Sequence, residues 1–400
     1  MRKHILLLIG LFAAFSFVAA ACGSDSDDVA TDDTAEESTD ETDEEAMEDS
    51  DEESTGEALK SLDAECSDSG SLELPEDFNV VLVTDIGKVD DGTFNQFAFE
   101  GMEGAADCFG FTDATSFIET VSEADYANNI AAALESEPEV IVTVGFLLAT
   151  DTLAAAQANP EVKFVGVDQF QVEYPENYVG VLFNEHEGGY MAGVLAASMS
   201  ESGTIGVVAG REDVPPVVKY VNGYEAGAKS VNADINVISI YNESFGDPAK
   251  GSSDAEQMIG EGADVIFGAG GPTGSGGVAA ATADGVWGIG VDQDEYFTTF
   301  DGGTAPGSEF LISSAMKRVD LSVFRNVQGA IDGTFAADGN IFVLTAANSG
   351  ITYAPFHDAD VNDAAASATE AARLGLADGS VDTGVCGIDG LFVGEGSACD

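Results

Sequence analysis

Short hydrophobic runs alternate with amphipathic stretches along most of the chain. The first hydrophobic runs are rich in β-branched residues and span residues 79–84, 139–146, 163–168 and 177–183. Such runs are typical of strands that are buried on both faces. Apolar residues recur at helical spacing in 94–109, 123–136 and 149–158. This alternation of strand and helix predicts a parallel sheet covered by helices.

The same alternation begins again after a predicted helix at 185–200. The second series has strands at 204–210, 235–241, 264–270 and 286–292, and helices at 216–230, 249–261 and 273–284. Because the two series are similar in length, the pattern predicts α/β architecture with two doubly wound parallel-sheet lobes. The segment 308–316 and a helix that begins near Lys317 are interpreted as a return to the first lobe.

These elements define a domain plan. Lobe 1 is expected to comprise 76–184 plus about 308–335, lobe 2 to comprise 185–307 plus about 336–376, and a tail to follow over 377–400. Ligands of open α/β sheets bind beyond the carboxyl ends of the strands. Two facing lobes place these ends around one cleft, so the residues at the strand ends are the candidates for binding.

The segment DDGTFNQFAFEGM, residues 90–102, opens the first helix. Thr93 and Gln96 fit a capping box, which makes Thr93 the N-cap and Phe94 the first helical residue. Phe94 either packs on the sheet, as aromatic residues at helical spacing commonly do, or faces the cleft. Asn95 carries an amide beside the helix start. A planar base can lie on the ring of Phe94 while this amide reads its edge.

Carboxylates follow several other predicted strands. Asp151 either caps the next helix or contacts a ligand, and Asp168 and Asp292 end their strands. An ionised carboxylate accepts two hydrogen bonds from a ribose-like diol, although each of these acids also suits a plain turn. Phe245 lies in the loop YNESFGDPAKG of the second series and offers another aromatic ring.

A glycine-rich segment, GAGGPTGSGG at 268–277, runs from a strand into a helix. Its glycines let the backbone approach a ligand closely. No GKS or GKT follows and no G-x-G-x-x-G is in register, although Asp292 lies about twenty residues on, as in a dinucleotide-binding pattern. Lys317 is one of only 10 Lys or Arg between residues 61 and 400. It either bridges to acids or contacts a ligand.

The start of the chain predicts export. Residues 1–22 combine a basic beginning, an apolar run shorter than a typical spanning helix, and the ending AAAC. This ending resembles a bacterial lipobox, in which Cys22 would carry diacylglycerol; the alternative is a plain secreted protein cut after an A-x-A sequence. Residues 23–60 are predicted to be a disordered acidic tether, because positions 23–57 hold 18 Asp or Glu and almost nothing apolar.

The rest of the chain is also acidic, with 55 Asp or Glu against 10 Lys or Arg over 61–400. Such a charge repels phosphate backbones and anionic lipids, so the sequence argues against nucleic-acid binding and predicts that the membrane is reached only through the lipid. The charge is interpreted as a source of solubility, suited to a saline habitat. An acidic docking face is the alternative.

Four cysteines follow Cys22, and an even number in an exported protein indicates disulfides. Cys66 precedes the first strand and Cys108 ends the first helix, so a strand–helix unit brings them to the same end. Cys386 and Cys399 would close a short loop. The chain has no C-x-x-C pair and only three histidines, so no metal site and no cofactor are expected.

Together these segments resemble the BMP (basic membrane protein, PnrA-like) family of bacterial lipoproteins, the substrate-binding components of ABC importers for purine nucleosides. The resemblance covers about 78–330 and rests, in order, on VLVTDIGKVDDGTFNQFAFEG, VGFLLATD, FNEHEGGYMAGVLAA, SFGDPAKG, GADVIFGAGGPTGSGG, GVWGIGVDQD and SSAMKRVD. It implies a periplasmic-binding-protein type I fold, in which three crossovers join two lobes and a nucleoside is enclosed between them.

The resemblance also implies roles for individual residues. Phe94 and Phe245 would sandwich the base, and Asn95 and Asp151 would read its edge.

The sugar would be held by a second group of residues. Asp292 and Lys317 would bind the ribose, Gly271 would approach by its backbone, and Asp85 belongs to the same opening motif. Pro272 departs from the family pattern, which usually has Gly or Thr at this position.

The sequence thus predicts a lipid-anchored receptor on the outer face of the cell membrane that hands a purine nucleoside to an ABC permease. Permease and ATPase are expected to be separate chains, because no Walker motif is found here. A sugar receptor of the same fold is one alternative. A nucleoside hydrolase or dinucleotide-dependent oxidoreductase is less favoured, because His186 and His357 lack a Ser or Cys nucleophile motif.

Overall fold

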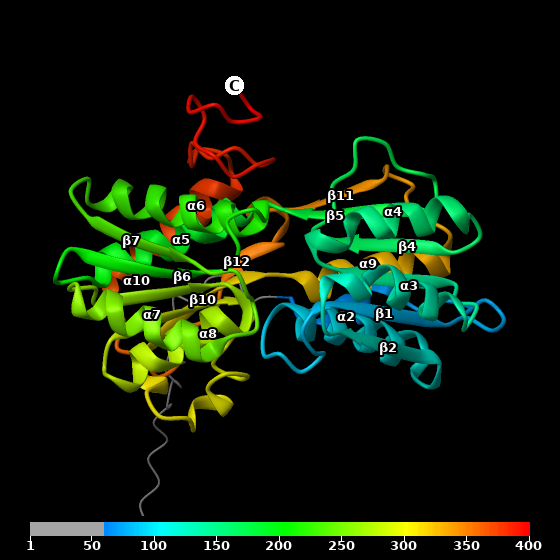
Figure 1. Cartoon of the computed structure of the whole chain (residues 1–400), viewed down its shortest axis with the longest axis horizontal. Coiled ribbons are helices and arrows are strands. Elements are labelled where there is room, and N and C mark those ends of the chain that lie inside the picture. Colours follow the sequence, from blue (N-terminus) through cyan, green and yellow to red (C-terminus); the bar gives the residue numbers. More distant parts are fainter. Residues whose placement is uncertain (1–59) are drawn as a thin grey trace, which may run out of the picture. The chain divides into compact units, whose positions relative to one another are not determined.

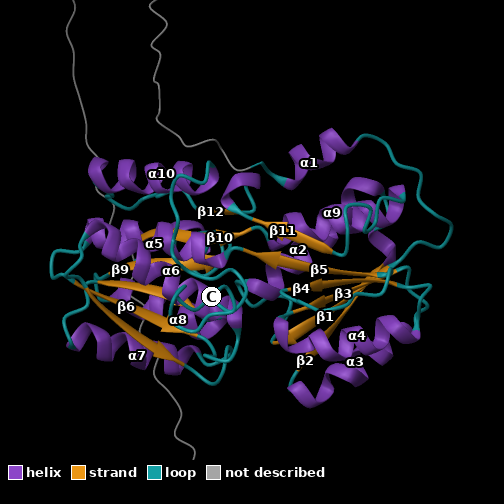
Figure 2. Ribbon diagram, turned by 90° about the horizontal axis from the view of Figure 1, so that it is seen from above, coloured by secondary structure: helices purple, strands orange, loops and turns teal. Residues whose placement is uncertain are grey.

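The computed structural model describes residues 60–400. Residues 1–59, with the predicted signal peptide, Cys22 and nearly all of the acidic tether, lie outside the described residues. The described chain forms two α/β lobes, each built around a six-stranded sheet with helices on both faces (Figures 1 and 2).

Lobe 1 contains an all-parallel sheet of strand order β11-β5-β4-β3-β1-β2. Its strands are β1 (Val80–Ile86), β2 (Thr115–Thr120), β3 (Val140–Val144), β4 (Lys163–Val167), β5 (Tyr178–Phe183) and β11 (Ile341–Leu344). Helices α2 (Phe94–Phe109) and α9 (Val319–Asp332) pack on one face, and α3 (Tyr126–Leu134) and α4 (Ala149–Ala158) on the other. The short helix α1 (Leu62–Ser69) lies against α2 and α9.

Lobe 2 contains a sheet of strand order β12-β10-β9-β8-β6-β7, in which only β12 is antiparallel among the described strands. The strands are β6 (Thr204–Ala209), β7 (Asn236–Tyr241), β8 (Val265–Ala269), β9 (Trp287–Asp292), β10 (Leu311–Lys317) and β12 (Ile351–Tyr353). Helices α5 (Glu185–Met199), α6 (Pro215–Val231) and α10 (Asp363–Ala377) cover one face, and α7 (Pro248–Gly260) and α8 (Gly271–Ala283) the other.

The chain passes between the lobes three times: from β5 to α5, from β10 to α9, and from β11 to β12. Two doubly wound lobes with three crossovers confirm the predicted periplasmic-binding-protein type I fold. The buried strands were located well from their sequence, because strands covered on both faces are continuous apolar runs.

The predicted boundary between the lobes was wrong in two places. Segment 308–316 was assigned to lobe 1, but it forms most of β10, which pairs with β9 in lobe 2. The chain returns to lobe 1 at the next helix, α9, which packs against α2. Strand β11, which fell in the predicted lobe 2, pairs with β5 in lobe 1. Burial explains both outcomes. All seven residues of β10 are buried, which requires an interior position, whereas β11 exposes Ile341 and Val343 and suits an edge.

Two disulfides join the cysteine pairs that the sequence suggested. Cys66–Cys108 links α1 to α2, and Cys386–Cys399 closes the segment after α10. This C-terminal loop packs against α6, where the amide of Asn222 donates to the carbonyl oxygen of Gly390 at 2.6 Å.

The start of α2 is capped by a residue other than the predicted one. Thr93 occupies the N-cap, but its side chain makes no capping hydrogen bond, and its Oγ1 is buried without a hydrogen-bond partner in the described part of the chain. Instead the carboxylate of Asp91 accepts from the backbone N–H groups of Thr93, Asn95 and Gln96, at 2.9, 3.2 and 3.1 Å. A carboxylate placed here satisfies free donors and favours the positive end of the helix. Asp91 therefore fixes the position of Phe94.

We predict that Asp91→Ala lowers the free energy of unfolding by about 1–2 kcal/mol, the usual cost of removing a helix cap. The matched variant Thr93→Val removes only a hydroxyl that has no partner, so its free energy of unfolding should equal or exceed that of the wild type. Urea unfolding of both variants measures the difference. A larger loss for Thr93→Val than for Asp91→Ala would restore the capping box predicted from the sequence.

Candidate functional site

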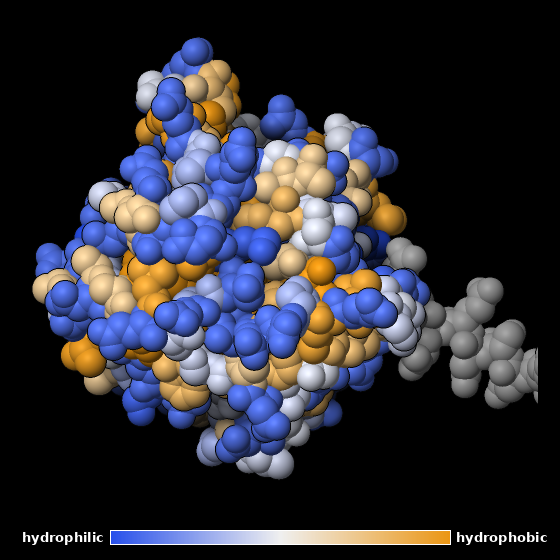
Figure 3. Space-filling model, turned by 90° about the vertical axis from the view of Figure 1, so that its right-hand side faces the viewer, coloured by the Kyte–Doolittle hydropathy of each residue, from blue (hydrophilic) through white to orange (hydrophobic). Residues whose placement is uncertain are grey.

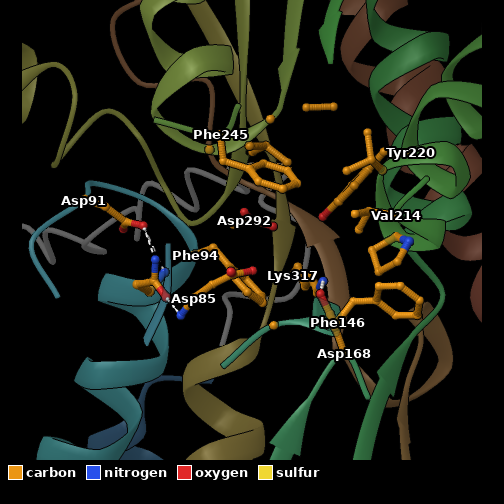
Figure 4. Close-up of a pocket in the computed structure, with 18 of the residues that line it drawn as sticks. Asp85, Asp91, Phe94, Phe146, Asp168, Val214, Tyr220, Phe245, Asp292 and Lys317 are labelled. Atoms are coloured by element: carbon orange, nitrogen blue, oxygen red, sulfur yellow. Dashed lines mark hydrogen bonds and ion pairs between the residues drawn. The ribbon is translucent and has the colours of Figure 1, made fainter. Parts of the chain in front are cut away.

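A pocket lies between the lobes, at the carboxyl ends of their parallel strands (Figure 4). It contains about 630 Å³ of space that atoms do not fill, and this volume includes open solvent at its mouth. Side chains from both lobes and from the end of β10 line it. This is the position that the fold favours for a ligand.

Seven of the eight ligand residues predicted from the sequence line this pocket: Asp85, Phe94, Asn95, Phe245, Gly271, Asp292 and Lys317. The eighth, Asp151, is not among the lining residues and lies partly exposed in the first turn of α4. A 3₁₀ turn, Phe146–Leu148, is inserted between β3 and α4. As a result Gly145 and Phe146, and not Asp151, reach the pocket from this connection.

Two phenylalanines reach the pocket from opposite lobes. Phe94 is the first residue of α2 in lobe 1, and Phe245 lies in the loop between β7 and α7 of lobe 2 (Figure 4). The ring of Phe245 rests on Gly210, where a Cβ atom would lie 2.3 Å from the ring atom Cε1. Phe146 and Tyr220 also line the pocket with aromatic rings, and neither residue was predicted from the sequence.

Asn95 is held by its own surroundings. Its Oδ1 accepts from the backbone N–H of Asp85 at 2.9 Å, and its Nδ2 donates to Asp91 at 2.9 Å. The amide thus ties α2 to the end of β1, and one N–H of Nδ2 has no hydrogen bond among these contacts. Asp85 is also engaged, since its Oδ1 accepts from the backbone N–H of Ile86 at 2.7 Å and from the hydroxyl of Tyr126.

Lys317 is the cation of the pocket. Its Nζ lies 2.6 Å from Asp168 Oδ2 and 2.9 Å from Glu185 Oε1. The same nitrogen lies 4.9 Å from the ring centroid of Phe94 and 4.7 Å from that of Phe183, distances at which a cation is attracted to a ring. The sequence left two roles open for Lys317, an ion pair with acids or a contact with a ligand. The ion pairs are present, and the ammonium also lines the pocket where a ligand could reach it.

Asp168 and Asp292 occupy corresponding places at the ends of β4 and β9. Both have left-handed backbone conformations, with φ of 61° and 67°, and both side chains are almost completely buried. Such conformations are uncommon outside glycine and concentrate at functional sites. Oδ1 of Asp168 is buried without a hydrogen-bond partner among the described residues.

The carboxyl groups of the pocket are hard to ionise. Burial raises the pKa of Asp292 to about 7, with Lys317 opposing and Asp168 adding to the shift. Burial also raises the pKa of Asp168 and of Asp85 to about 6 in each case. The lining holds four carboxyl groups, including Asp91, and one ammonium. This favours an uncharged ligand rich in O–H and N–H donors over an anion.

The lobes touch at the mouth of the pocket. The hydroxyl of Thr298 donates to the carbonyl oxygen of Gly92 at 2.8 Å, and the amide of Gln293 donates to that of Thr93 at 3.2 Å. An ion pair also joins Arg211 of lobe 2 to Glu123 of lobe 1. These contacts hold the two lobes together around the pocket.

The part of the chain that the structure describes contains neither a cluster of metal ligands nor a helix that could span a membrane. No group of His, Cys, Asp and Glu side chains between residues 60 and 400 is arranged to hold a metal ion. No helix over the same residues is both long enough and apolar enough to cross a bilayer.

The fold has a close counterpart among solved structures. A solute-binding protein of an ABC transporter system from Aeropyrum pernix K1 superposes with a TM-score of 0.67 and 25% sequence identity, over 76% of this chain and 92% of that one. The two proteins share the two-lobed architecture.

Sequence comparisons lead to the same class of protein. The ABC transporter nucleoside-binding protein BmpA of Lactococcus lactis subsp. cremoris is 34% identical over 287 residues, which cover 69% of this chain and 81% of the relative. Basic membrane protein B of Borreliella burgdorferi is 33% identical over 267 residues, or 64% and 73% of the two chains. The model of the PnrA-like family matches residues 78–369. The chain belongs to the Bmp family of PnrA-like ABC transporter substrate-binding proteins.

Proposed function

We propose that this substrate-binding protein takes up a purine nucleoside between its lobes and presents it to an ABC permease on the outer face of the membrane. The observation that carries the proposal is the pair Phe94 and Phe245, which enter one pocket from opposite lobes. A flat base between two rings gains stacking energy only when the lobes are closed, so the ligand itself favours closure.

The polar groups of the pocket suit the rest of a nucleoside. Asp168 and Asp292 supply buried carboxylates beside the ammonium of Lys317 (Figure 4). The 2′- and 3′-hydroxyls of a ribose can donate to such carboxylates, and a hydroxyl oxygen can accept from the ammonium. Oδ1 of Asp168, which has no hydrogen-bond partner within residues 60–400, is available for such a bond. The backbone at Gly271 is open to a ligand, since a Cβ there would meet nothing closer than 3.4 Å.

A nucleoside also fits the electrostatics of the site. It is neutral and carries several hydroxyl donors, whereas a nucleotide would bring phosphate next to four carboxyl groups. The name of the Lactococcus lactis relative, a nucleoside-binding protein, supports the same class of ligand. The two relatives described above are named as a nucleoside-binding protein and a basic membrane protein, which supports a receptor over an enzyme. Permease and ATPase would be separate chains.

The lipid anchor is part of the proposal. Cys22 after three alanines would hold the chain at the membrane, and the acidic segment that follows would serve as a tether.

We expect inosine, guanosine or adenosine to bind with micromolar or tighter affinity in isothermal titration calorimetry, and Phe94→Ala to weaken binding by about 1–3 kcal/mol, the scale of one lost base stack. The matched control is Phe99→Ala on the same helix, since Phe99 packs on Phe117 and does not line the pocket. Equal heats with ribose alone would favour a sugar receptor, and release of free base during incubation would favour an enzyme.

Affinity for inosine should increase as pH rises from about 5.5 to 8. Ribose hydroxyls donate more strongly to an ionised carboxylate than to a neutral carboxyl group, so Asp292, with a pKa of about 7, should bind them best once it has lost its proton. Asp292→Asn should weaken binding at pH 8 and reduce this pH dependence, leaving the part that comes from Asp168 and Asp85. A wild-type affinity that is constant over the same range would contradict this role.

Asp292 should also lower the stability of the ligand-free protein at neutral and higher pH. Its pKa is about 7 in the folded state but close to 3.8 in an unfolded chain, so the folded state binds the proton more tightly, and stability falls as pH rises between these values. Asp292→Asn should therefore raise the free energy of unfolding at pH 8, by on the order of 1–2 kcal/mol. Urea unfolding at about pH 5 and 8 measures the effect, and a loss of stability at pH 8 would refute it.

Cys22→Ala should move the protein from the membrane fraction to the soluble fraction and abolish labelling with radioactive palmitate in the producing bacterium. Unchanged labelling would place the lipid elsewhere, and a soluble wild-type protein would favour the plain secreted form.

A further inference from the structure

Four charged side chains form a buried chain of alternating sign behind the pocket. Lys219 Nζ lies 2.5 Å from Glu185 Oε2, Glu185 Oε1 lies 2.9 Å from Lys317 Nζ, and Lys317 Nζ lies 2.6 Å from Asp168 Oδ2. Glu185 is completely buried, and none of the other three exposes more than 7% of its surface. Only Lys317 and Asp168 line the pocket, so Glu185 and Lys219 act behind it.

Glu185 lies where the chain crosses between the lobes. It is the first residue of α5, directly after the crossover from β5, and Lys317 ends β10 directly before the second crossover. Lys219, on α6, also donates to the carbonyl oxygen of Phe183 at 2.8 Å. Helices α5 and α6 approach closely here, since a Cβ on Gly223 would lie 2.2 Å from the carbonyl oxygen of His186. This approach brings Lys219 and Glu185 together.

The contacts of Lys317 show what Glu185 contributes. An ammonium has three N–H groups and no acceptor. Asp168 Oδ2 accepts a hydrogen bond from one of them at 2.6 Å, and Glu185 Oε1 forms an ion pair with the same nitrogen at 2.9 Å. An N–H group that Asp168 does not take is available to the pocket. Without Glu185 the ammonium would have Asp168 alone to orient it, with Asp292 as a competing acid in the same space.

We propose that Glu185 is a positioning residue, which fixes the ammonium of Lys317 so that one of its N–H groups points at a hydroxyl oxygen of the ligand, and that Lys219 holds Glu185 in place. The inference rests on the proposed function, because the ligand oxygen is that of a nucleoside ribose. It adds two residues that do not line the pocket and that were not identified from the sequence.

The ionisation of these groups is consistent with this arrangement. Burial alone would raise the pKa of Glu185, but Lys219 and Lys317 lower it to about 2, so the carboxylate stays ionised. Burial alone would lower the pKa of Lys317, but Asp168, Glu185 and Asp292 raise it above its ordinary value. These are the charged groups that face the ammonium.

A purely structural role is the competing explanation, in which Glu185 only neutralises Lys219. The two explanations differ for a double variant. Glu185→Gln alone leaves Lys219 buried without its counter-charge and should destabilise the fold. Glu185→Gln with Lys219→Met removes one charge of each sign and leaves the Lys317–Asp168 pair, so the net charge of the chain is unchanged.

We expect the double variant to regain most of the thermal stability lost in Glu185→Gln, while its dissociation constant for inosine stays roughly 10- to 100-fold above the wild-type value, the effect of one mispositioned hydrogen bond to a charged group. Calorimetric titration and thermal unfolding of the three proteins test this. If the double variant binds inosine as tightly as the wild-type protein does, the positioning role of Glu185 is overturned.

A second measurement needs no ligand. The chain has seven lysines between residues 60 and 400, few enough to follow by NMR of 13Cε-labelled lysine, and Lys317→Gln assigns the Lys317 signal. The Lys317 signal at pH 7 should move in the double variant relative to the wild type, because the carboxylate 2.9 Å away is lost. An unchanged signal would overturn the inference. Failure of wild-type protein to bind any nucleoside, with the NMR shift observed, would instead refute the proposed ligand.

Discussion

The constraint on which the site depends is the cost of keeping charge away from water. Lys317 is almost fully buried where the two lobes meet, and a lone ammonium there would be unstable. Its contacts with Asp168 of lobe 1 and Glu185 at the start of α5 provide the compensation. Because these partners come from different parts of the fold, the ammonium can be satisfied only when β4, α5 and β10 have their native arrangement. The position of the pocket cation is thus a consequence of the architecture.

The same constraint explains why the pocket is acidic beyond what its cation can balance. Raised pKa values at Asp85, Asp168 and Asp292 mean that the ligand-free protein holds carboxyl groups that water would solvate better. A ligand with several hydroxyl donors replaces part of that lost solvation, so its binding relieves a cost that folding has already incurred. Groups that bind a ligand in this way reduce stability in its absence, a trade between stability and function that is common at binding sites.

Local sequence patterns predicted much of this structure. They failed for elements whose position depends on pairing with residues far away in the sequence. The residue ranges of α2 and α4 follow from helical spacing, and the buried strands follow from their apolar runs. Strand β2 was missed because it is an edge strand with exposed positions, and its sequence TSFIET resembles a loop. The sheet membership of β10 and β11 depends on pairing partners that no local pattern encodes.

The candidate site shows the same division. Phe94, Asp292 and Lys317 were found because each follows a strand or opens a helix, where the fold places ligands. Glu185 and Lys219 could not be found in this way, since they contact another side chain and not the pocket, and the sequence segment FNEHEGGYMAG gives no sign of which acid is buried. A buried acid at the start of a helix indicates a role at the site only when its partners, here Lys219 and Lys317, are known. An isolated buried ion pair can often be replaced by apolar residues without loss of stability. Glu185 differs from such a pair because it also compensates the charge of Lys317, which links the Glu185–Lys219 pair to the pocket.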